Sequence, residues 1–152
     1  MFKRMTKIKK LMNEKDSYTI LENGSYGVLG TLSDNGYPYT VPLNYVYYQN
    51  KIYFHCAKTG HKLDNIKKHE KVSFTVVGNE SIIEKEFTTK YKSVTLFGVA
   101  KIIEPSREIL MELVKKYSKN FVNLGREVVD KDFLTAAIVE ITINHITGKE
   151  SK

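Results

Sequence analysis

Residues 40–62 read TVPLNYVYYQNKIYFHCAKTGHK, and this stretch carries most of the information about the fold. Its first half alternates in the manner of a strand with one buried face, formed by Val41, Leu43, Tyr45 and Tyr47. Gln49 and Asn50 then mark a tight turn, and a second strand follows with Ile52, Phe54 and Cys56 on one face. The stretch therefore predicts a β-hairpin that leads into a basic loop.

The loop after this hairpin contains Lys58, Gly60, His61 and Lys62, and a helix is predicted over residues 60–68. A helix N-terminus offers free backbone N–H groups and a partial positive charge. A glycine there lets the backbone approach an anion closely. Lys58 and Lys62 together carry enough charge to neutralise a phosphate dianion. We therefore predict a phosphate site at this loop, with an ordinary solvated basic turn as the alternative.

The strand over residues 41–45 is a candidate surface for a flat ring. Pro42 lacks a ladder donor, which favours an edge strand or a bulge. The free backbone groups of an edge can read the polar edge of a flavin, and the Asn44 amide offers both a donor and an acceptor. An ordinary edge strand is the alternative. His55 and His61 lie on either side of the basic loop and are further candidates for ligand contact.

The remaining pattern predicts a mainly β fold with a few added helices. Asn35 and Gly36 form a turn signal between two strands. The helices are expected at residues 16–23, capped by Asp16 or Ser17 and closed by a left-handed Gly24, and from Pro105 to residue 117. Six strands are expected, at residues 26–32, 39–48, 52–56, 71–77, 92–103 and 136–146. Gly98 indicates a bulge, a barrel corner or a closely approaching ligand, and residues 80–90 are expected to form a surface loop or short helix. A six-stranded antiparallel Greek-key barrel or curled sheet fits this list.

Length, charge and composition set limits on the function. The 152 residues, with a formal net charge of +7 and one cysteine, predict a single domain over residues 1–152. No apolar run approaches the ~20 residues of a membrane span, and no secretory signal is recognised. The lone Cys56 cannot form an internal disulfide, which fits a reducing cytoplasm. No metal-binding, GxSxG, Walker A or GxGxxG motif is present, so we predict no metal site and no Ser/His/Asp chemistry.

Three segments together resemble a known family: residues 27–78, residues 91–103 with the sequence YKSVTLFGVAKII, and residues 138–151 with the sequence IVEITINHITGKES. They are similar to the FMN-binding split-barrel family related to pyridoxamine 5′-phosphate oxidase, and within it to the Nim-type branch of 5-nitroimidazole reductases. The resemblance covers most of the chain and is weakest at residues 80–90 and 120–134.

The resemblance implies a six-stranded split barrel that dimerises and binds FMN at the subunit interface. It places the FMN phosphate at His61 and Lys62, where the oxidases have an arginine before the lysine. The flavin ring would lie along Val41, Pro42, Leu43, Asn44 and Tyr45, with a fifth-strand contact at Ser93 and Val94. The substrate-binding residues of the true oxidases have no match here. The implied chemistry is hydride transfer from NAD(P)H to bound FMN and then to a small acceptor such as a nitro compound.

Three hypotheses follow from these observations. The first is a cytoplasmic, homodimeric FMN-dependent oxidoreductase. The second is a non-catalytic flavin- or haem-binding module for storage or sensing, for which His55, His61 and His145 are of interest because some members of the superfamily bind haem. The third is a nucleic-acid-binding barrel, suggested by the net charge of +7 alone. The sequence gives no catalytic acid or base.

Overall fold

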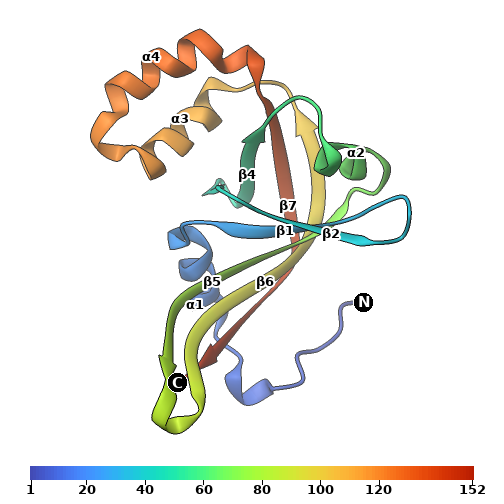
Figure 1. Ribbon diagram of the computed structural model, residues 1–152, viewed down its shortest axis with the longest axis vertical. Coiled ribbons are helices and arrows are strands. Elements are labelled where there is room, and N and C mark those ends of the chain that lie inside the picture. The colour runs from blue at the N-terminus through green and yellow to red at the C-terminus, as the bar shows by residue number, and fades with distance from the viewer.

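The computed structural model describes all 152 residues and shows one antiparallel sheet of seven strands with four α-helices around it (Figure 1). The strands lie in the order β2-β1-β5-β6-β7-β4-β3 across the sheet. Their bounds are β1 Gly27–Leu32, β2 Pro38–Leu43, β3 Val46–Tyr48, β4 Lys51–Cys56, β5 Lys71–Ile83, β6 Thr88–Ile103 and β7 Ala137–Ser151. The mainly β antiparallel prediction is confirmed.

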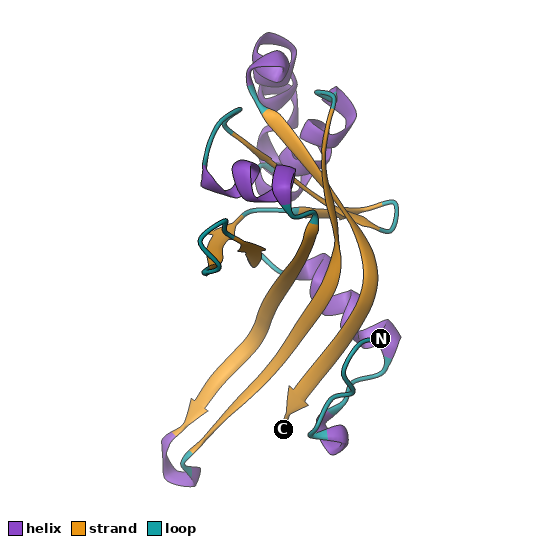
Figure 2. Ribbon diagram, turned by 90° about the vertical axis from the view of Figure 1, so that its right-hand side faces the viewer, coloured by secondary structure: helices purple, strands orange, loops and turns teal.

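The three longest strands, β5, β6 and β7, form the centre of the sheet and run along most of the molecule (Figure 2). β6 pairs with both of the others, and its register with β7 shifts between Phe97 and Gly98. This shift is the bulge that Gly98 predicts. The three long strands are curved, and the shorter strands pair with them at both sides: β1 and β2 beyond β5, and β4 and β3 beyond β7.

The main core lies on the inner face of the curved sheet. Side chains from most of the strands are fully buried there: Leu29, Phe54, Phe74, Leu96 and Ile141. Helix α1 (Glu14–Asn23) adds Leu21, and helix α2 (His61–Lys68) adds Leu63 and Ile66. The inward positions of Leu63 and Ile66 agree with the predicted helical spacing.

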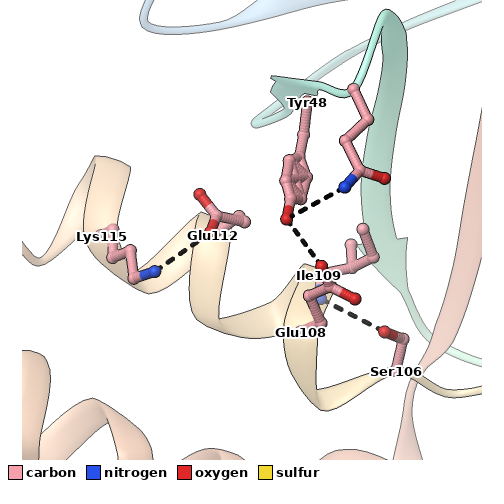
Figure 3. A network of polar contacts seen from close by, with 7 residues as sticks. Tyr48, Ser106, Glu108, Ile109, Glu112 and Lys115 are labelled. Carbon is pink, nitrogen blue, oxygen red and sulfur yellow. Dashed lines mark hydrogen bonds and ion pairs between the residues drawn. The ribbon is translucent and has the colours of Figure 1, made fainter.

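A second apolar cluster forms where helices α3 (Arg107–Tyr117) and α4 (Val122–Asp132) pack as a hairpin against β3, β4 and β7. Figure 1 shows the two helices at one end of the sheet. The Ser106 side chain caps α3 by accepting a hydrogen bond from the backbone N–H of Ile109 (Figure 3). The Tyr48 hydroxyl donates to Glu108 Oε1 at 2.6 Å and so ties β3 to the first turn of α3.

The sheet has seven strands and is not a closed barrel, which corrects the six-stranded prediction. The strand expected over residues 39–48 breaks at Asn44 and Tyr45 into β2 and β3. These two strands form opposite edges of the sheet, although only two residues separate them. The alternation of inward side chains continues across the break, and this is why the pattern alone reads as one strand.

Several element boundaries differ from prediction. Asn13, rather than Asp16 or Ser17, caps α1, since its side chain accepts from the Asp16 N–H at 2.8 Å. Gly24 has φ −61° and is not left-handed; a Cβ there would lie 2.4 Å from Val76 Cγ1, so close packing requires the glycine. Pro105 precedes the cap of α3 and lies outside the helix.

The largest boundary differences concern the long strands. Residues 80–90 form the end of β5, a short 3₁₀ turn and the start of β6, so this region is a hairpin. Its charged side chains are exposed to solvent, because this end of the hairpin extends beyond the hydrophobic core. β7 continues to Ser151, beyond the predicted end at residue 146. No helix has the length and apolar character needed to cross a membrane.

Candidate functional site

The basic loop leads directly into the N-terminus of α2, as the sequence predicts. Gly60 occupies the N-cap position with φ 154° and ψ 168°, a conformation that L side chains rarely adopt. A Cβ at this position would meet no atom within 4 Å, so the space over the glycine is open. No side chain caps α2, in contrast to α1 and α3. The N–H groups of its first turn are therefore available to an anion.

A buried polar network attaches α2 to the first hairpin of the sheet. The Asn65 amide donates to Thr31 Oγ1 at 3.0 Å and to Ser33 Oγ at 3.2 Å. Ser33 Oγ also lies 2.9 Å from His61 Nε2, and the His61 ring lies 4.0 Å from the Tyr39 ring. Because Thr31, Ser33 and Asn65 are buried, their mutual hydrogen bonds hold the N-terminus of α2 in a fixed position.

The two lysines of the loop have no carboxylate partner. The ion pairs of the protein involve other cations, and neither Lys58 nor Lys62 is among them. The His61 ring contacts Ser33 and Tyr39, whereas Lys58 and Lys62 supply the unpaired ammonium groups of the loop. Burial raises the pKa of the half-buried Cys56 thiol, and the nearby charge of Lys62 opposes this rise.

β2 is an edge strand, which confirms the interpretation of Pro42. It pairs only with β1, so its other edge has no neighbouring strand. Val41 and Leu43 pack against the main core, whereas Pro42 and Asn44 are exposed. Of the predicted ring-contact residues in and next to β2, Pro42 and Asn44 thus present their side chains to a ligand, and Val41 and Leu43 present only their backbone.

Tyr45 occupies the break between the two edge strands and is fully buried. Its hydroxyl donates to the Leu21 carbonyl, and burial raises its pKa above the ordinary value. Its backbone N–H donates to the Tyr117 hydroxyl at 3.0 Å, and its carbonyl accepts from Lys116 Nζ at 2.9 Å. Neither backbone group of Tyr45 is free to read a ring, so its role is to support the adjacent Asn44.

Ser93 and Val94 lie in β6 and are separated from β2 by β1 and β5. Three strand steps of about 4.8 Å place them roughly 14 Å from β2. Val94 is fully buried, and Ser93 is half-buried with ladder partners on both β5 and β7. Within one copy of the chain these two residues therefore do not join the loop and the edge strand.

His55 is exposed and lies with Asn44 in the lining of an apolar pocket of about 370 Å³ under α3 and α4. The α3 side of this pocket belongs to a helix that the sequence predicts, whereas no helix is predicted over residues 120–134, which include α4. Val122, Val129 and Phe133 recur at i, i+7 and i+11, which was the available signal for α4. The structure places no group of three His, Cys, Asp or Glu side chains so as to hold a metal ion.

Comparison with solved structures shows the same fold in other proteins. The conserved hypothetical protein Rv2991 from Mycobacterium tuberculosis is 17% identical, with a TM-score of 0.81, over 98% of this chain and 90% of that one. A protein from Bacteroides thetaiotaomicron named for 5-nitroimidazole antibiotic resistance is 17% identical, with a TM-score of 0.68, over 92% and 86% of the two chains. The FAD and haem binding protein from Mycobacterium smegmatis is 14% identical, with a TM-score of 0.69, over 94% and 74%.

A comparison with curated proteins gives no match. The family model described as pyridoxamine 5′-phosphate oxidase matches residues 13–150, which span the sheet, the basic loop and both helices of the α3–α4 hairpin. The match confirms the resemblance carried by the hairpin and the loop after it. The chain belongs to the pyridoxamine 5′-phosphate oxidase family.

Proposed function

We propose that the protein is an FMN-dependent oxidoreductase that transfers electrons from NAD(P)H to a small acceptor such as a nitro compound. The observation that carries the proposal is the N-terminus of α2. An uncapped first turn, an open Gly60 and the unpaired Lys58 and Lys62 come together there. This set of donors fits a phosphate monoester, because backbone N–H groups and ammonium groups both favour a dianion.

The edge of β2 supports the position of the flavin ring. β2 begins beside the basic loop, since Tyr39 contacts His61, and it ends at Leu43, next to Asn44. A ligand with its phosphate at α2 would extend along the unpaired edge toward Asn44. The amide of Asn44 then offers a donor and an acceptor to the polar edge of the ring. Tyr45, fixed by Tyr117 and Lys116, holds this end of the edge rigid.

A second copy of the chain completes the site in this proposal. Ser93 lies on a strand too distant from β2 to reach the same ligand within one protomer. A homodimer would bring the Ser93 surface of one protomer to the loop and edge strand of its partner. We propose such a homodimer with the cofactor at the interface.

The flavin would supply the redox chemistry, accepting a hydride from NAD(P)H and passing two electrons to the acceptor. The chain's own residues bind the phosphate, orient the ring and exclude water. No side chain along this path is assigned as a general acid or base. The Bacteroides thetaiotaomicron protein named for 5-nitroimidazole resistance supports a nitro compound as one acceptor, through likeness of fold.

A haem-binding module is the second candidate. The observation that favours it is His55, whose exposed imidazole makes no side-chain hydrogen bond and lies beside an apolar pocket. The Mycobacterium smegmatis protein of the same fold binds both FAD and haem. By contrast, the His61 ring is held by Ser33 and Tyr39. The His145 ring stacks on Phe2 and Phe97, so of the three candidate histidines His55 is the one without a ring partner.

An absorbance spectrum of the concentrated protein, recorded before and after denaturation, tests the proposal. Flavin bands, with FMN identified in the released fraction, are the expected result. A Soret band without flavin bands would support the haem module instead. Protein that is colourless and binds neither added FMN nor added haem would overturn both assignments. Gel filtration with light scattering then tests the homodimer, which a monomeric mass in the FMN-bound protein would exclude.

A further inference from the structure

The pocket under the α3–α4 hairpin is distinct from the basic loop. Its volume is about 370 Å³, within the range of small-ligand sites. One side consists of the apolar side chains Leu110, Leu113, Val114 and Val129 from the two helices, and β4 contributes His55. Leu110, Leu113 and Val129 are also members of the second core cluster, so the floor of the pocket is part of a packed layer.

The pocket is apolar on its helical side and polar on its strand side. It includes no lysine or arginine, and its one carboxylate, Asp132, is exposed. Asn44 and His55 lie on the strand side, and both offer N–H donors. A phosphate or carboxylate would find no cation here. A neutral ligand with an apolar body and an acceptor oxygen at one end matches the lining.

The helices that form the pocket are held in place by specific contacts at both ends. Arg107 of α3 pairs with Asp130 of α4, with Nε 3.3 Å from Oδ1. The guanidinium of Arg107 also lies 4.1 Å from the centroid of the Phe133 ring, which lines the pocket. At the other end, Tyr117 bonds to Tyr45 beside Asn44. The pocket is therefore a preformed cavity between anchored elements.

We infer that this pocket binds a neutral planar conjugated dione of the quinone class, with its apolar ring against α3 and α4 and one carbonyl oxygen near Asn44 and His55. Asn44 belongs both to this pocket and to the end of the β2 edge, so the oxygen end of the ligand faces the proposed ring position. The binding itself depends on the pocket alone. Its role as the acceptor site rests on the proposed function.

In that role the reaction balances as a two-electron reduction. NAD(P)H supplies a hydride and water supplies a proton. The quinone gains both electrons and two protons to become the hydroquinone, and NAD(P)H leaves as NAD(P)⁺. The residues of the pocket orient the oxygen and exclude water, and none of them is required to be oxidised or reduced.

Equilibrium dialysis of the purified protein against duroquinone, without NAD(P)H, tests the binding. Duroquinone carries methyl groups at all four ring carbons next to its carbonyls, so it cannot add to the Cys56 thiol. Val128→Trp places a large side chain at the mouth of the pocket, where Val128 is 54% exposed. Leu124→Trp is the matched control, because Leu124 is 57% exposed on the same helix one turn earlier and does not line the pocket.

The expected result is saturable binding to the wild-type protein, weakened at least ten-fold by Val128→Trp and changed less than two-fold by Leu124→Trp. Amide chemical-shift mapping on the wild-type protein gives a measurement that needs no variant, with duroquinone shifting Val114, Val129 and Ala136 but not Leu124. Failure of duroquinone to bind, or equal weakening by both tryptophans, would overturn the inference. Specific duroquinone binding by a protein that takes up no added FMN would keep this inference and overturn only the proposed function.

Discussion

The hydroxyl oxygen of Tyr117 accepts a hydrogen bond from the backbone N–H of Tyr45 at 3.0 Å, across 72 residues of sequence. The same hydroxyl lies 2.7 Å from the Ser25 carbonyl and 3.0 Å from the Tyr45 carbonyl, so its proton serves one of these acceptors at a time. A side chain of α3 thus forms hydrogen bonds with the backbone groups of Tyr45, where the chain passes from β2 to β3. This contact keeps the two edge strands apart without leaving a buried N–H unpaired.

Tyr117→Phe should lower the free energy of unfolding by about 1–3 kcal/mol, because it leaves the Tyr45 N–H without its partner. Urea unfolding followed by circular dichroism measures the change. Tyr37→Phe is the control, since Tyr37 is 73% exposed and its hydroxyl makes no hydrogen bond. If the two variants are equally stable, the hydroxyl of Tyr117 is not needed to stabilise the break between β2 and β3.

Lys116 should make the stability depend on pH in the alkaline range. Burial lowers its pKa from 10.5 to about 8, and its ammonium group has no carboxylate partner. Between these two pH values the unfolded chain therefore binds one more proton at Lys116 than the folded chain. The free energy of unfolding is highest above about pH 10.5, where Lys116 is neutral in both states, and this contribution is lost as the pH falls through about 8.

The measurement compares unfolding free energies of wild type and Lys116→Met from about pH 7 to pH 11, a window set by linkage. The wild-type value minus the variant value should rise between pH 8 and 10.5 and stay level below pH 8. Lys115→Met serves as the control, because Lys115 is exposed and pairs with Glu112. A level difference across the whole range would show that Lys116 titrates normally in the folded protein.

Gly60→Ala should destabilise the protein by about 1–3 kcal/mol, the usual cost of a backbone conformation that excludes side chains. The open space over Gly60 means that this cost comes from φ and not from a clash. Gly78→Ala is the matched control, since its Cβ would make only an ordinary contact, at 3.9 Å from Ile20. Thermal unfolding distinguishes the two variants, and equal melting temperatures would contradict the expected strain.

Lys62→Ala should weaken FMN affinity by about 1–3 kcal/mol, the loss of one charge-assisted hydrogen bond to phosphate. Fluorescence titration of flavin-free protein with FMN gives the dissociation constant. Lys67→Ala removes an equal charge from the last turn of the same helix, away from its N-terminus. Equal affinities of the two variants for FMN would locate the phosphate elsewhere on the protein.

The candidate site could be predicted in part because its components are local in sequence. Gly60, Lys62 and the start of α2 lie within a few residues of one another, so a glycine before a helical pattern is enough to locate them. Asn65 and Ser33, which fix that helix to the sheet, are 32 residues apart and belong to elements whose contact no periodicity indicates. The pocket under α3 and α4 likewise joins segments far apart in sequence, with His55 on β4 and Val129 on α4.

The sequence by itself determined the antiparallel strands, the turn at Gln49 and Asn50, the inward faces and the basic loop. Each of these follows from side-chain period or from backbone preferences within a few residues, and the turn residues indeed have φ 48° and 65°. Only the tertiary structure decided that residues 39–48 form two strands instead of one. The backbone N–H and C=O of Tyr45 could pair with another strand or with side chains. In the folded protein they bond to Tyr117 and Lys116, which α3 places there.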